Sequence, residues 1–144
     1  MSASPFTPEQ ARFLSSRRVG RLATATADGR PHVVPVCYAF DGVLLYTPID
    51  EKPKRVGVGE LRRIRNLREN PRASLVVDDY DEEWSKLAFV IVQGRVEIVE
   101  RGDERSEALA LLREKYPQYR AMALEERPLL VIEPESVAAW GRVG

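Results

Sequence analysis

The residues best suited to chemistry in this sequence are the cations of the segment EKPKR, at positions 51–55. Lys52, Lys54 and Arg55 follow the apolar run VLLYT, which is typical of a strand. A phosphate is held by convergent N–H and cationic donors, and a loop at a strand end leaves its backbone free to supply them. The segment therefore indicates a phosphate site. The alternative is an ordinary solvated loop.

Two further positions are candidates for contact with a flat ligand. Pro35 interrupts a good strand pattern, and a proline cannot donate a ladder hydrogen bond, so it indicates an edge, a bulge or a strand that opens onto a ligand. Trp84 follows an acidic run and is either a lid that packs on the core or an aromatic wall for a ring. Trp140, near the C-terminal end, allows the same two interpretations.

A basic segment follows the EKPKR loop. Four arginines occur at helical spacing, and the simplest interpretation is a solvated helix face. They are Arg62, Arg63, Arg65 and Arg68. Arg62 and Arg65, which are one turn apart, could instead meet an anionic tail.

Several kinds of site are not supported. A single histidine, His32, and a single cysteine, Cys37, cannot build a zinc centre, so no metal site is expected. No glycine-rich phosphate loop and no GxSxG nucleophile elbow is present, which disfavours Rossmann, P-loop and serine-hydrolase chemistry. His32 is expected to be a strand residue near the surface.

Composition sets broader limits. The chain has 144 residues, of which 44% are hydrophobic and 31% charged, which suits one globular domain over residues 1–144. The 22 basic and 22 acidic residues balance, so the whole chain has no net attraction for nucleic acid or for an anionic membrane. A lone cysteine cannot form an internal disulfide, and no secretory signal or long apolar run is apparent. We expect a soluble, cytoplasmic protein.

Periodicity and turn signals predict the elements that position these residues. Thr7, Pro8 and Gln10 form a capping-box start for a helix over residues 8–16. Asp28-Gly29 and Asp41-Gly42 are hairpin turns that would join three strands. The expected strands and helices cover residues 19–26, 31–40, 43–47, a helix at 60–70, 72–78, 86–100, a helix from 103 to 116, and 127–134.

The connecting segments are expected to be irregular. Residues 49–59 and the acidic run 79–84 would be loops, and residues 135–144 a short C-terminal tail. The strand over 86–100 is apolar in its first half, as in a strand covered on both faces, and Gly94 marks a bend or bulge. About six strands with peripheral helices predict a mainly β fold with α, a small antiparallel barrel.

The order of these segments resembles a known family. GRLATATADGRPHVVPVCYAFDG, VLLYTPIDEKPKR, RNLRENPRASLVVDDYDEEW and VQGRVEIV are similar to the flavin-reductase-like split β-barrel superfamily that includes pyridoxamine 5′-phosphate oxidase. The resemblance is strongest to the branch of oxidoreductases that depend on the deazaflavin coenzyme F420. It runs from about Val19 to Val99 and more weakly through the last strand.

The resemblance implies an FMN-binding type of six-stranded split barrel that forms a homodimer, with a cofactor in each groove between subunits. The segment Pro35, Val36 and Cys37 and the pair Tyr46 and Thr47 would flank the ring and its side chain. The cations of EKPKR, Lys52, Lys54 and Arg55, would hold the phosphate. Trp84 would lie near the cofactor. One departure is the apolar stretch 87–91, where oxidases carry polar residues that help to bind the flavin.

The implied function is hydride transfer between bound F420 and a small planar substrate such as an enone or quinone. No catalytic side chain is needed, because the cofactor carries the hydride. The alternatives are an FMN-dependent oxidoreductase of the same fold, a non-catalytic binding protein for a flavin or haem, and a purely structural dimer.

Overall fold

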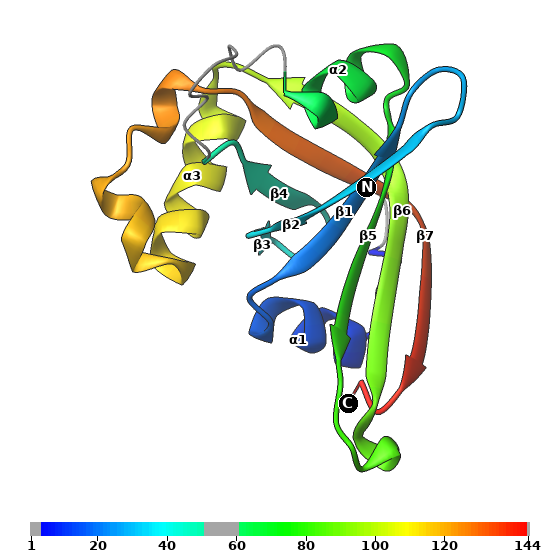
Figure 1. Cartoon of the computed structure of the whole chain (residues 1–144). Coiled ribbons are helices and arrows are strands. Elements are labelled where there is room, and N and C mark those ends of the chain that lie inside the picture. Colours follow the sequence, from blue (N-terminus) through cyan, green and yellow to red (C-terminus); the bar gives the residue numbers. More distant parts are fainter. Residues whose placement is uncertain (1–3, 51–60, 144) are drawn as a thin grey trace.

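The computed structural model describes residues 4–50 and 61–143, and Figure 1 shows them as a curled antiparallel sheet with helices around it. The elements are α1 (Pro8–Ser16), β1 (Gly20–Ala25), β2 (Pro31–Val36), β3 (Ala39–Phe40), β4 (Leu45–Pro48), α2 (Arg62–Glu69), β5 (Arg72–Asp79), the short 3₁₀ helix η2 (Trp84–Lys86), β6 (Ala88–Val99), α3 (Asp103–Lys115), the 3₁₀ helices η3 (Pro117–Ala121) and η4 (Leu124–Glu126), and β7 (Leu129–Gly141). The seven strands are ordered β2-β1-β5-β6-β7-β4-β3. This sheet is consistent with a split barrel, with one strand more than expected.

Local sequence signals account for several elements. Thr7 caps α1, since its hydroxyl accepts from the Gln10 N–H at 3.1 Å and the Gln10 side chain bonds the Thr7 N–H in return. Gly29 and Gly42 adopt φ of 91° and 101°, as tight turns after Asp28 and Asp41 require. The predicted capping box and both turns are confirmed.

The predicted strand over 31–40 is wrong in one respect, because it breaks into β2 and β3 at Cys37 and Tyr38. The Tyr38 N–H donates to the Tyr116 hydroxyl at 3.2 Å, and the Tyr38 carbonyl accepts from Lys115 Nζ at 3.0 Å. The backbone of Tyr38 is therefore bonded to side chains at the end of α3 instead of to a neighbouring strand. At this point the chain leaves β2, at one edge of the sheet, and enters β3, at the other edge.

The C-terminal residues are also not the tail that was expected. They continue β7, which pairs antiparallel with β6 from Ala88–Gly141 to Val99–Leu129. The register shifts between Gln93 and Gly94, so Glu135 is an extra residue in β7. The predicted bulge at Gly94 is confirmed, and the tail becomes half of a long strand pair.

The interior contains two apolar clusters. The larger lies inside the curled sheet, against α1 and α2, with Leu14, Leu22 and Val90 fully enclosed. The smaller joins α3 and the 3₁₀ helices to β4 and to the first half of β7, around Leu112 and Leu129. The larger cluster anchors α2 and the smaller cluster anchors α3, and Figure 1 shows the two helices apart from each other beside the ends of the strands.

Two expectations about burial are wrong. Arg63 does not belong to a solvated face but is buried in α2, while Arg62, Arg65 and Arg68 are exposed. The first half of β6 is not covered on both faces, because its residues alternate between buried and half-buried. In this single chain one face of the β5–β6–β7 region is only partly covered. No helix among the described residues combines the length and the apolarity needed to cross a membrane.

Candidate functional site

Three of the predicted site residues come together at the end of β2. Pro35, Val36 and Cys37 line a hollow of about 140 Å³. The rest of its lining comes from the segment before β1, the end of β4 and α2, namely Val19, Pro48, Asp50 and Arg63. The walls are mostly apolar, with one carboxylate and one guanidinium. A carboxylate accepts hydrogen bonds and a guanidinium donates them, so the combination suits an uncharged, hydroxylated group that can do both.

A polar cluster behind the hollow holds its rear wall in place. The Tyr119 hydroxyl donates to Asp50 Oδ2 at 2.5 Å, and the Tyr116 hydroxyl donates to the Arg18 carbonyl at 2.7 Å. Lys115 Nζ lies 3.9 Å from the centre of the Tyr38 ring, at the strand break. These contacts tie the end of α3 to both strands that border the hollow.

The cluster carries shifted pKa values. Burial, followed by the charge of Arg18, lowers the pKa of Lys115 to about 8. Burial raises the pKa of Tyr116 to about 12. Burial, followed by the hydrogen bond to Asp50, raises the pKa of Tyr119 above its ordinary value. The two phenols therefore keep their protons near neutral pH, and Tyr119 can act as a donor to Asp50.

Tyr46 and Thr47 lie next to this region, but their side chains do not line the hollow. The Tyr46 hydroxyl donates to Asp41 Oδ2 at 2.6 Å, and its ring belongs to the smaller apolar cluster. The Thr47 hydroxyl is buried, and among the described residues it has no hydrogen-bond partner. Their predicted role beside a ring stays a prediction.

The remaining predicted residues are not brought to the hollow in this chain. Lys52, Lys54 and Arg55 lie outside the described residues. Trp84 is 70% exposed on η2, in the connection between β5 and β6, which in Figure 1 lies at the opposite end of the sheet from α2. Trp140 stacks on Phe89 with ring centres 6.1 Å apart. Exposed aromatic surface of this kind is available to a second molecule.

A basic hollow lies between α2 and the β1–β2 turn. Its cations are Arg30, Arg62 and Arg65, and Thr26, Asn66 and Glu69 complete its lining. Arg30 and the Pro35–Cys37 segment are separated by most of β2, which spans roughly 17 Å at the usual rise per residue.

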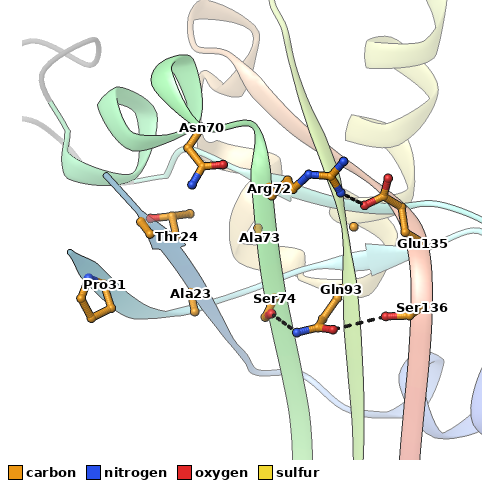
Figure 2. A pocket seen from close by; sticks show the side chains of 12 residues that line it. Ala23, Thr24, Pro31, Asn70, Arg72, Ala73, Ser74, Gln93, Glu135 and Ser136 are labelled. Carbon is orange, nitrogen blue, oxygen red and sulfur yellow. Dashed lines mark hydrogen bonds and ion pairs between the residues drawn. The ribbon is translucent and has the colours of Figure 1, made fainter. Parts of the chain in front are cut away.

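A third cavity, of about 570 Å³, lies on the outer face of the sheet. Figure 2 shows its floor, where Ser74, Gln93 and Ser136 form a row across three strands. Gln93 Nε2 donates to the Ser74 hydroxyl at 3.2 Å, and the Ser136 hydroxyl donates to Gln93 Oε1 at 3.3 Å. An Arg72–Glu135 ion pair forms one side. The bulge residue Glu135 therefore lies at the rim of this cavity, where it pairs with Arg72.

These dimensions limit where a tricyclic cofactor would be held. Pockets for drug-sized ligands have volumes of roughly 300–1,000 Å³. The hollow at Pro35–Cys37 holds only part of such a molecule, and its carboxylate and guanidinium fit the hydroxylated chain of a flavin-type group. Among the described residues, no three His, Cys, Asp or Glu side chains gather as metal ligands would.

Three residues of this region were not predicted as site residues, namely Val19, Asp50 and Tyr119, and Arg63 was predicted to face solvent. Asp50 lies two residues after the end of β4 at Pro48, so its place near a strand end was a visible signal. Tyr119 gave no such signal, because it meets Asp50 across 69 residues of sequence.

Comparisons with known proteins agree with this fold. A curated relative, the 5a,11a-dehydrotetracycline/5a,11a-dehydrooxytetracycline reductase of Streptomyces rimosus, is 29% identical, and the alignment covers 97% of this chain and 86% of the reductase. Among solved structures, a conserved hypothetical protein of Mycobacterium tuberculosis has a TM-score of 0.77 and 26% identity, with 99% of this chain and 91% of that chain covered. An FAD-binding protein of Mesorhizobium loti has a TM-score of 0.67 and 27% identity, with coverage of 93% and 94%.

A further structure, described only as an F420 reductase, has a TM-score of 0.65, with 88% of this chain and 94% of that chain covered; at 24% identity it supports the fold alone. The model of the family described as "Pyridoxamine 5'-phosphate oxidase" matches residues 6–141. A match over nearly the whole chain establishes that this protein belongs to the pyridoxamine 5′-phosphate oxidase family.

Proposed function

We propose that this protein is an oxidoreductase that binds coenzyme F420 and reduces a small planar substrate such as an enone or quinone. The proposal rests on two hollows near the two ends of β2. One is partly apolar and lies at Pro35–Cys37, and the other is basic and is lined by Arg30, Arg62 and Arg65. The similarity to a curated reductase supports the reaction class.

The residues of this chain bind and orient. Pro35, Val36 and Pro48 give the hollow a wall that excludes water, and Arg63 places a cation against it. When bound, reduced F420 supplies a hydride to the substrate, and a proton from water completes the two-electron reduction. The protein contributes position and a dry surface, and no side chain needs to form a bond to the substrate.

The basic hollow favours F420 over FMN. Both cofactors carry a tricyclic ring, a hydroxylated chain and a first phosphate, but only F420 continues into a longer acidic tail. Arg62 and Arg65 are exposed one turn apart on α2 and line this hollow together with Arg30. These three cations outnumber the one carboxylate of the lining, Glu69, so the hollow favours an acidic tail. FMN is too short to use them, so a contribution of these arginines to affinity separates the two cofactors.

We further propose that two copies of the chain complete the cofactor site. The hollow at Pro35–Cys37 is too small for three fused rings. The outer face of the same chain exposes Val33, Trp140 and the half-buried Phe89. A second copy that presents these apolar side chains would cover a ring that the first copy holds by its chain and phosphate.

The test is a fluorescence titration of purified protein with F420, with its tail-less deazaflavin fragment and with FMN. We expect F420 to bind most tightly. Replacing Lys52 and Lys54 together by Ala should weaken F420 and FMN by at least about tenfold, because each charged hydrogen bond is worth ~1.5–3 kcal/mol.

A second pair of substitutions isolates the tail. Arg62→Ala with Arg65→Ala should weaken F420 alone, whereas Arg68→Ala, on the same helix but outside the hollow, serves as the matched control. Equal affinities for FMN and F420 in all variants would favour the FMN-dependent alternative. Tight F420 binding without oxidation of the reduced form by any enone or quinone would favour a binding protein. No binding of either cofactor would refute the proposal.

A further inference from the structure

The hollow at Pro35–Cys37 has the size of a chain and not of a ring. Its volume of about 140 Å³ is less than half the lower bound of roughly 300 Å³ for drug-sized ligands. Three fused rings therefore remain outside it. The part of a redox ligand that enters is slender, and in a flavin or deazaflavin the slender part is the hydroxylated chain.

Asp50 is fixed in orientation at the wall of this hollow. Its Oδ2 accepts from the Tyr119 hydroxyl at 2.5 Å, and Tyr119 is 4% exposed on η3. The Tyr119 ring is packed against Tyr116, with ring centres 5.4 Å apart. Because one carboxylate oxygen is tied to a buried phenol, the side chain cannot turn freely.

Within the part of the chain that the structure describes, the other oxygen of Asp50, Oδ1, accepts no hydrogen bond. The apolar wall formed by Val19, Val36 and Pro48 cannot donate one either. An ionised carboxylate accepts and does not donate, so it selects a ligand group that carries a hydrogen. It also repels a phosphate, which must then lie elsewhere.

We infer that Asp50, held by Tyr119, is a specificity-determining residue that accepts a hydrogen bond from a hydroxyl group on the chain of the redox ligand. This inference rests on the proposed function. It also gives the ligand a direction, because the hydroxylated portion faces Asp50 and the anionic end points away from it. Tyr119 is the positioning residue of the pair.

The experiment compares ligands with and without the hydroxylated chain. Riboflavin carries the chain, and lumiflavin carries a methyl group in its place. Their 5-deaza analogues differ in the same way. Dissociation constants for both ring series are measured by fluorescence titration on wild type, Asp50→Ala, Tyr119→Phe and the control Glu82→Ala, which removes an exposed acid between β5 and η2.

For wild type and the control we expect the chain-bearing ligand to bind at least about tenfold more tightly, as one charged hydrogen bond allows. In Asp50→Ala this ratio should fall to about one while the lumiflavin affinity is unchanged. Tyr119→Phe keeps the carboxylate but frees it, so its ratio should lie between the two. Circular dichroism checks that each variant is folded.

A ratio that stays at the wild-type value in folded Asp50→Ala overturns the inference and leaves the proposed function standing. If none of these ligands nor F420 binds to wild type, the proposed function is refuted and the inference falls with it. A loss of affinity for lumiflavin as large as that for riboflavin also overturns the inference, because it reports a general disturbance of the site.

Discussion

The backbone of β6 lies close to the backbone of β7 at Gly94, and replacement of this glycine by Ala tests how tightly the two strands pack at the bulge. A Cβ at this position would lie 2.1 Å from the Glu133 carbonyl oxygen, 2.9 Å from the Glu133 carbonyl carbon and 3.1 Å from Pro134 Cα. All three atoms are backbone, so no side chain can rotate away. The two strands must separate by about 1 Å to reach ordinary contact distances.

The cost follows from this displacement. Overpacking of a well-packed site costs about 1–3 kcal/mol. Each ladder hydrogen bond weakened beside the bulge adds about 1 kcal/mol, and the lower chain entropy of Ala in the unfolded state returns less than about 1 kcal/mol. We expect Gly94→Ala to lower the free energy of unfolding by about 3 kcal/mol.

Gly20→Ala is the matched control. The same substitution in β1 would place its Cβ 2.7 Å from Leu75 Cδ1, the flexible end of a side chain. That methyl group can move, so the expected loss is about 1 kcal/mol or less. Both variants are unfolded in urea and followed by far-UV circular dichroism.

With a urea dependence of about 1–3 kcal/mol/M, a loss of about 3 kcal/mol lowers the midpoint by about 1–3 M. A Gly94→Ala midpoint no lower than that of Gly20→Ala would refute the claim that backbone contact at the bulge fixes the β6–β7 register.

Two further predictions concern the polar cluster at the end of α3. In the folded protein the pKa of Lys115 is about 8 against 10.5 for the free side chain, so the unfolded state binds more protons between these values and the wild type should gain stability as the pH rises through that window. Lys115→Met should lack this gain, and a constant difference between the urea midpoints of the two proteins from pH 8 to 10 would contradict the assignment. Tyr116→Phe leaves the buried Tyr38 N–H without its acceptor and should cost about 1–3 kcal/mol in urea unfolding, whereas Tyr80→Phe at an exposed position should change it little; similar losses in both variants would argue against the role of the Tyr116 hydroxyl.

Local signals in the sequence predicted most of the fold. The capping residues of α1 and the two Asp-Gly turns depend on neighbours close in sequence, and both predictions are confirmed. The bulge at Gly94 is also confirmed, although its extra residue, Glu135, lies in the partner strand. The break between β2 and β3 could not be predicted in this way. It depends on a hydrogen bond between Tyr38 and Tyr116, which are 78 residues apart.

The prediction of a C-terminal tail in place of the second half of β7 was wrong for a related reason. Ala138, Ala139 and Gly141 have weak strand propensity, so the segment looks like a tail. It is a strand because β6 offers it an unbroken partner through the register Ala88–Gly141 to Gln93–Ser136. Tertiary pairing overrides intrinsic preference there.

The candidate site was predicted in part. The family resemblance pointed to the Pro35–Cys37 segment, and in the structure this segment lines a hollow. Asp50 and Tyr119 were missed, since their meeting depends on how η3 packs against β4. Arg63 was predicted to face solvent because helical spacing alone does not show how much of the helix circumference is covered by the barrel.

The free edge of β2 has a consequence for how this sheet ends. Pro31, Val33 and Pro35 alternate along β2 and share one pairing type with β1, opposite Ala25, Ala23 and Arg21. Since proline has no N–H to give to β1, the backbone groups at these three positions point away from the sheet. Of the three, only Val33 retains a donor for an incoming strand.

Two missing donors in three make the border of the molecule a poor template for another strand. This edge therefore disfavours the addition of another chain and the growth of the sheet into ribbons or fibrils. Because β2 is a sheet edge that disfavours pairing with another strand, it can stay accessible to a small molecule.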